Sequence, residues 1–153
     1  MKNVSMTLPI SPVTIVMIED DEGHARLIEK NIRRAAVSNE ILAFVDGTSA
    51  LRFLLGADAS GEVNGGRQFI VLLDLNLPDM SGLDILRQVK GNTHLKNVPI
   101  VVLTTTDDAQ EIRRCYDEGA NFYITKPVSY EGFANAIKQL GLFFSVVQIP
   151  VTS

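Results

Sequence analysis

The sequence has little cysteine, no excess of basic charge and no long apolar run. Its one cysteine, Cys115, excludes an internal disulfide framework and a cysteine-rich zinc site, and favours a reducing compartment. Acidic residues outnumber basic ones by 18 to 14 and no basic patch stands out, which argues against binding to nucleic acid. The sequence contains no uninterrupted apolar stretch of about 18 residues, and residues 1–12 do not read as a signal peptide. We therefore expect a soluble, cytoplasmic protein that contacts neither nucleic acid nor membrane.

The composition is that of one ordinary globular domain. The chain has 153 residues, of which 46% are hydrophobic, and this length is too short for two well-filled cores. We expect an N-terminal extension over residues 1–12, a folded domain over 13–144 and an apolar C-terminal tail over 145–153.

Short apolar segments alternate with segments of helical spacing along the folded domain. The apolar segments, two of them weaker, are residues 15–18, 41–45, 70–73, 100–103 and 121–124. The helical segments are residues 22–36, residues 48–55, one from Ser81, one from Asp107 or Asp108 to Gly119, and one from Ser129. Continuous apolar runs are typical of strands covered on both faces. The alternation predicts an α/β fold, a doubly wound five-stranded parallel sheet with helices on both faces.

Polar residues follow the strands at the edge where such folds bind ligands, beyond the carboxyl ends. They are Glu19, Asp20 and Asp21 after the first strand, Asp74, Thr104, and Lys126. Alone, each is most simply a helix cap, a turn residue or a loop residue. Together, the carboxylates would converge, and two such charges about 4 Å apart repel by about 4 kcal/mol at an effective dielectric constant near 20. The cluster therefore needs cations, of which Lys126 supplies one and a hard divalent ion, Mg²⁺ or Mn²⁺, would supply another.

These groups are the components of phosphoryl transfer onto an aspartate. Asp74 would be a carboxylate nucleophile beside a metal ion, Thr104 a hydroxyl donor and Lys126 a second cation. The chemistry therefore points to an aspartyl phosphate.

Four segments in this order, IVMIEDD, LLDLNLPDMSG, PIVVLTTTDD and GANFYITKP, resemble the receiver domain of two-component response regulators over roughly residues 13–140. The resemblance implies a flavodoxin-like sheet in strand order 2-1-3-4-5. It also implies a single-domain regulator that takes a phosphoryl group from the phosphohistidine of a sensor histidine kinase and then switches its protein-interaction surface. The resemblance implies no enzyme activity beyond self-catalysed phosphorylation and dephosphorylation.

The family pattern also implies a role for each matching residue. Asp74 is the implied phosphoacceptor, with Glu19 and Asp20 as the acidic pair at the metal ion and Asn76 offering its backbone carbonyl to it. Lys126 matches the lysine that pairs with the phosphate.

Two further positions concern the switch and the backbone. Thr104 matches the switch hydroxyl, and Tyr123 matches the aromatic residue that turns inward when that threonine moves. The bond between Lys126 and Pro127 resembles one that is cis in the family.

The C-terminal stretch predicts an interface, because a single helix face cannot bury all its apolar residues. We expect a homodimer through Leu140, Phe143, Phe144 and Val147, whereas the simpler alternative is that a few of them pack on the core. This tail, with the segments EDDEGHARLIEKNI and TTTDDAQEIRRCYDEGANFYITKPV, resembles single-domain receivers that partner bacterial phytochrome kinases, which implies a light-sensing kinase as phosphodonor.

Other functions remain open from the sequence alone. A haloacid-dehalogenase-like phosphohydrolase also uses an aspartate at a strand end, but it needs a second acid two residues later, where this chain has Asn76. A flavodoxin needs a phosphate loop where this chain has acids. A third alternative is an adaptor that acts independently of phosphorylation.

Overall fold

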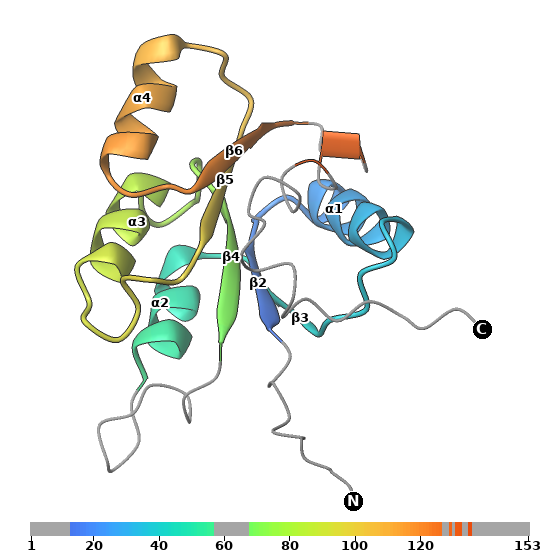
Figure 1. The fold of residues 1–153 in the computed structure, drawn as a ribbon, viewed down its shortest axis with the longest axis horizontal. Helices are drawn as coiled ribbons and strands as arrows, with labels where there is room; N and C mark the ends of the chain where they lie inside the picture. The colour runs from blue at the N-terminus through green and yellow to red at the C-terminus, as the bar shows by residue number, and fades with distance from the viewer. Residues whose placement is uncertain (1–12, 57–67, 127–128, 130, 133–134, 136–153) are drawn as a thin grey trace, which may run out of the picture.

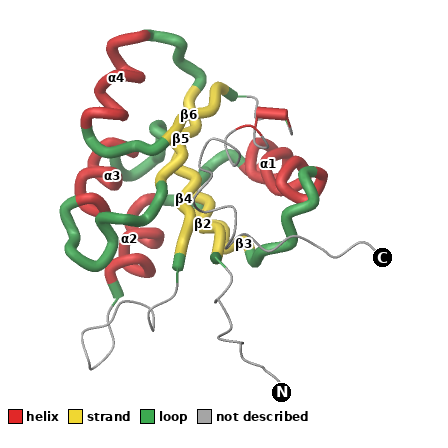
Figure 2. The backbone as a smooth tube through the Cα atoms, in the orientation of Figure 1, coloured by secondary structure: helices red, strands yellow, loops and turns green. Residues whose placement is uncertain are grey.

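The protein folds around a five-stranded parallel sheet. The computed structural model describes residues 13–56, 68–126, 129, 131–132 and 135. Its strands are β2 (Thr14–Ile18), β3 (Ile41–Phe44), β4 (Phe69–Asp74), β5 (Ile100–Thr104) and β6 (Phe122–Thr125). They lie in the order β3-β2-β4-β5-β6, which is the predicted order 2-1-3-4-5 counted along the chain (Figure 2).

Helices cover both faces of the sheet, as the alternating pattern predicted. They are α1 (Glu22–Arg34), α2 (Gly47–Leu55), α3 (Gly82–Lys90) and α4 (Ala109–Asp117). Helix α1 lies on one face, and α2, α3 and α4 lie on the other (Figure 1). Of the helix predicted from Ser129, the described residues 131, 132 and 135 are helical, and the Ser129 hydroxyl accepts a hydrogen bond from the Gly132 N–H at 2.9 Å. None of the helices in the described ranges is long and apolar enough to span a bilayer.

The three central strands explain the continuous apolar runs. Every residue of β2, β4 and β5 is buried, and successive side chains enter two separate cores. Val16 and Ile18 pack with α2, α3 and α4, whereas Ile15 and Met17 pack with α1. The edge strands β3 and β6 are only partly buried, which is why their apolar patterns are weaker.

A capping side chain starts each of the four helices. Asp21, Asp46, Ser81 and Asp108 each accept a hydrogen bond from a backbone N–H in the first turn. At Ser81 the hydroxyl accepts from the Leu83 N–H at 3.1 Å, and the carboxylate of Asp84 pairs with Arg87. The caps fix the residue at which each helix begins after the loop at the carboxyl edge of the sheet.

The start of α3 packs directly against the end of β4. The Gly82 N–H donates to the Leu75 carbonyl at 3.0 Å. A Cβ at Gly82 would lie 2.6 Å from the Asp74 carbonyl oxygen and 2.7 Å from the Leu75 Cα, closer than such atoms can approach. Glycine is therefore required here by the proximity of backbone rather than by a positive φ.

We predict that Gly82→Ala lowers the free energy of unfolding by about 2 kcal/mol, because the clash is with backbone and no side chain can move to relieve it. Gly23→Ala is the matched control in the first turn of α1, where the added Cβ meets the Asp21 Oδ1 at 3.3 Å and no backbone. That control should change stability by no more than about 1 kcal/mol. Urea denaturation measures both, and equal stability of the two variants would contradict the prediction.

Candidate functional site

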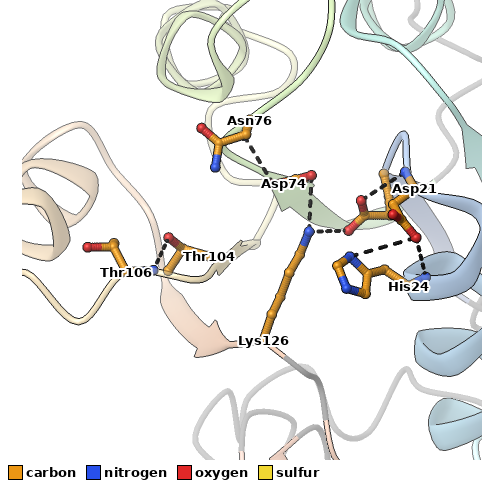
Figure 3. A network of polar contacts seen from close by, with 8 residues as sticks. Asp21, His24, Asp74, Asn76, Thr104, Thr106 and Lys126 are labelled. Atoms are coloured by element: carbon orange, nitrogen blue, oxygen red, sulfur yellow. Dashed lines mark hydrogen bonds and ion pairs between the residues drawn. The ribbon is translucent and has the colours of Figure 1, made fainter.

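The carboxyl ends of four parallel strands bring the predicted residues to one edge. Glu19 follows β2, Asp74 ends β4, Thr104 ends β5 and Lys126 follows β6. The Lys126 N–H donates to the Thr104 carbonyl at 2.8 Å, which fixes the start of the Lys126 side chain beside β5. In Figure 3 that side chain extends to Asp74, with Thr104 at the end of β5 and Thr106 on the loop that follows. The strand order therefore brings these four residues to one edge of the sheet.

Lys126 joins two buried carboxylates. Its Nζ lies 2.6 Å from Glu19 Oε1 and 3.1 Å from Asp74 Oδ2. The side chains of Lys126, Glu19 and Asp74 are 7%, 1% and 5% exposed. Charges removed from water to this extent need close partners, and the one ammonium group contacts both acids.

Backbone N–H groups orient the same carboxylates. The other oxygen of Asp74, Oδ1, accepts from the Asn76 N–H at 3.0 Å. The other oxygen of Glu19, Oε2, accepts from the Asp21 N–H at 3.1 Å. Each acid is thus held by one ammonium contact and one amide, so both point in fixed directions.

The electrostatics of the pair follow from burial and charge. Burial raises the pKa of Glu19, and the charge of Asp74 adds to the rise, while the contacts with Lys126 and the Asp21 N–H oppose it. Burial acts to lower the pKa of Lys126, but its hydrogen bonds to Glu19 and Asp74 outweigh that effect and raise it. Lys126 is therefore a permanent cation at neutral pH.

The acids also form a group that suits a divalent cation. Glu19, Asp20 and Asp74 each place a carboxylate oxygen within 4.8 Å of the others. Two of these residues are buried and Asp20 is exposed, so the cluster is open to solvent on one side. Carboxylate oxygens are the donors that Mg²⁺ and Mn²⁺ prefer, and one lysine leaves the cluster short of positive charge. The donor set and its charge therefore fit a hard divalent ion.

Thr104 and Tyr123, the predicted switch residues, lie on the neighbouring strands β5 and β6. Thr104 is buried, and its Oγ1 accepts from the Thr106 N–H at 3.1 Å. Tyr123 is half-buried on β6, opposite Val102 of β5. Its ring packs edge-to-face on Tyr116 of α4, with 6.1 Å between centroids. The structure thus places Tyr123 between the sheet and α4.

Comparison with known proteins gives the family. The sequence-family model of the response regulator receiver domain matches residues 15–138. The chain belongs to the response regulator receiver family. Among curated relatives, the response regulator Rcp1 of Synechocystis is 34% identical over 116 residues, which are 75% of this chain and 77% of that protein.

Solved structures agree with this membership. A response regulator receiver domain from Rhodospirillum rubrum is 72% identical, with a TM-score of 0.73, and the match covers 92% of this chain and 99% of that one. The bacteriophytochrome response regulator AtBRR is 33% identical, with a TM-score of 0.75 and coverage of 94% and 99%. A Mn²⁺-bound form of Rcp1 is 28% identical, with a TM-score of 0.65 and coverage of 92% and 100%. This receiver domain is thus related to phytochrome response regulators, and its family implies a histidine kinase as partner.

Several predicted positions lie outside the described residues. They are Pro127, with its expected cis bond, and the expected interface residues Leu140, Phe143, Phe144 and Val147.

One residue has a role that the sequence did not reveal. The sequence around Asp79 predicts a turn residue. In the structure, its carboxylate accepts hydrogen bonds from the N–H groups of Gly47 and Thr48, at 2.9 and 2.8 Å, and from the Thr48 hydroxyl. Its partners are 31 and 32 residues away, and no local motif signals such a contact. Asp21, in contrast, caps α1 as expected, through a 2.9 Å bond from the His24 N–H.

We predict that Lys126→Met lowers the free energy of unfolding by about 3 kcal/mol at neutral pH in metal-free buffer, because two buried carboxylates lose their cation. The loss should grow as pH rises. The pKa of Glu19 is already raised by burial and would rise further in the variant. Below that pKa, Glu19 is protonated in the folded variant and the loss of stability is small. As pH rises through that pKa, the carboxylate ionises without a cation beside it and the loss grows. A loss of stability that did not depend on pH would contradict this explanation.

Two measurements complete the test. Lys96→Met, at an exposed lysine, should change stability by no more than about 0.5 kcal/mol. Adding Mn²⁺ should restore more stability to Lys126→Met than to the wild type, because the ion then provides the only cation facing the acids.

Proposed function

We propose that this receiver domain is a single-domain response regulator that accepts a phosphoryl group on Asp74 from the phosphohistidine of a sensor kinase. A carboxylate oxygen of Asp74 forms the new O–P bond as the N–P bond of the phosphohistidine breaks. The histidine nitrogen keeps the bonding electron pair and takes a proton from solvent. The product is an aspartyl phosphate, which extends into the space that the acids and Lys126 surround.

The contact of Lys126 with both Glu19 and Asp74 is the observation that carries this proposal. Asp74 is buried, and Lys126 and the Asn76 N–H orient its carboxylate anion. Such an anion is a nucleophile fixed in position. Lys126 can follow the transferred phosphoryl oxygens, because a lysine ammonium has three donors on a flexible stem.

We propose Mg²⁺ as the ion held by Glu19, Asp20, Asp74 and the backbone carbonyl of Asn76. When bound, it neutralises negative charge on the phosphoryl oxygens. The oxygen donors of the three acids support Mg²⁺ or Mn²⁺ over softer metals.

The response follows from the groups next to Asp74. The Thr104 hydroxyl, which now accepts from the Thr106 N–H, can donate to a phosphoryl oxygen and draw the loop over residues 104–108 toward it. Tyr123 then rotates inward, and its contact with Tyr116 carries the change to α4. The surface built from α4, β6 and the helix after Ser129 is the proposed output surface, within a receiver domain that spans residues 13–144.

The proposed phosphodonor is a kinase of the bacterial phytochrome type. The structural neighbours named as phytochrome response regulators support this assignment, since the matches to AtBRR and to the phosphorylated phytochrome response regulator RcpA cover 99% and 100% of those chains.

We predict that the wild-type chain is labelled by a small phosphodonor, phosphoramidate, only when Mg²⁺ is present, and that Asp74→Asn abolishes the label. Intact-protein mass spectrometry at neutral pH measures the added phosphoryl group. Asp84→Asn is the matched control, because Asp84 is an exposed acid on α3 paired with Arg87, and it should be labelled like the wild type. Equal labelling of Asp74→Asn would refute the proposal, and sustained release of phosphate from a phosphomonoester would favour the phosphohydrolase.

We also propose that the chain forms a homodimer through Leu140, Phe143, Phe144 and Val147, because this apolar stretch exceeds what one helix face can bury. Light scattering at tens of micromolar should give the mass of two chains, and Phe143→Glu combined with Phe144→Glu should give the mass of one. A monomeric wild type at that concentration would contradict the prediction.

A further inference from the structure

The loop between β4 and α3 is tied to α2 as well as to its own ends. Near its base, residues Asn76 and Ser81 form an isolated antiparallel bridge, and the Gly82 N–H donates to the Leu75 carbonyl. At its tip, the carboxylate of Asp79 binds the first turn of α2. The loop thus has two anchors, one local and one distant.

The anchor on α2 is well defined. Asp79 Oδ1 accepts from the Gly47 N–H at 2.9 Å, and Oδ2 accepts from the Thr48 N–H at 2.8 Å and from the Thr48 hydroxyl. These bonds, the Thr48 hydroxyl first, lower the pKa of Asp79 to about 2. Gly47 permits the close approach, because a Cβ there would lie 2.5 Å from both Cγ and Sδ of Met80.

The same loop carries a contact of the phosphoacceptor. The Asn76 N–H, three residues before Asp79, holds Asp74 Oδ1 at 3.0 Å. The partly buried Leu77 and Met80 pack against the core, but apolar contacts of this kind have no direction and fix the orientation of a peptide group poorly. The hydrogen bonds of Asp79 do have direction.

We propose that Asp79 is a positioning residue, which anchors the loop over residues 75–81 on α2 and so holds the Asn76 peptide against the carboxylate of Asp74. The inference rests on the proposed metal-assisted acceptance of phosphate at Asp74. It adds α2, through Gly47 and Thr48, to the elements that shape the site.

The competing explanation is that Asp79 only caps α2. That helix already has a cap, since Asp46 Oδ1 accepts from the Ser49 N–H at 2.7 Å. Asp46 does not belong to the loop, so Asp46→Ala weakens the same helix end without touching the loop tip. This variant separates the two explanations.

The experiment compares Asp79→Ala, Thr48→Val and Asp46→Ala with the wild type by two readouts that need no phosphodonor. The first is hydrogen exchange of the Asn76 amide by NMR, and the second is the affinity for Mn²⁺ alone. In Asp79→Ala we expect faster exchange at Asn76 and a dissociation constant for Mn²⁺ about tenfold higher, because partners behind a metal site affect affinity on that scale. Thr48→Val, which keeps the backbone donor and loses the hydroxyl, should show smaller changes in both.

Asp46→Ala should leave both readouts unchanged, and Asp79→Asn, which keeps an acceptor oxygen, should partly restore them. The inference is overturned if Asp79→Ala leaves Asn76 exchange and Mn²⁺ affinity unchanged, or if Asp46→Ala alters them equally. Should Asp79→Ala not fold, unchanged readouts in Thr48→Val overturn it instead. A wild type that binds Mn²⁺ but is not labelled at Asp74 would refute the proposed function and leave this comparison intact.

Discussion

The arrangement at the carboxyl edge depends on one interaction, the contact of the Lys126 ammonium with Glu19 and Asp74. Burying two carboxylates at this depth without a cation would be costly, because desolvation costs several kcal/mol per charge. Lys126 follows β6, which lies two strands away from β4 in the sheet. The contact of Lys126 with Asp74 therefore requires β4, β5 and β6 to pair in this order. The fold and the site are therefore mutually dependent, since the sheet brings the charges together and the lysine makes their burial tolerable.

Lys126 neutralises the negative charge of the acids only in part. Three acids face one lysine, and the repulsion between Glu19 and Asp74 contributes to the raised pKa of Glu19. A site whose acids were fully neutralised by lysine would not attract a divalent ion. The residual negative charge favours a metal ion, and the lysine offers a partner for the phosphoryl oxygens. Binding of a divalent ion would then reduce the repulsion among the three acids.

The sequence allowed the strands and the convergence of the main site residues to be predicted for a physical reason, whereas the strand order was implied only by the resemblance to receiver domains. Residues 70–73 and 100–103 are buried on both faces, so no polar side chain interrupts them, and the rule that parallel strands end at one edge turns their positions along the chain into proximity in space. The Asp79 anchor could not be predicted in this way. Its partners Gly47 and Thr48 have no periodic or motif relation to it, and only the packing of α2 beside α3 brings them together.

The two loops that flank Asp74 are held in contrasting ways, and this contrast has a consequence for signalling. The loop after β4 is anchored by Asp79 to a different helix, whereas the loop after β5 is held by bonds between near neighbours. There, Thr104 Oγ1 accepts from the Thr106 N–H, Thr106 Oγ1 from the Asp108 N–H, and Asp108 Oδ1 from the Gln110 N–H. Such local bonds at a mostly exposed loop are each worth little and exchange readily with water. A change at Asp74 should therefore move the loop after β5, and with it the start of α4, while the loop after β4 keeps its shape and serves as the fixed side of the site.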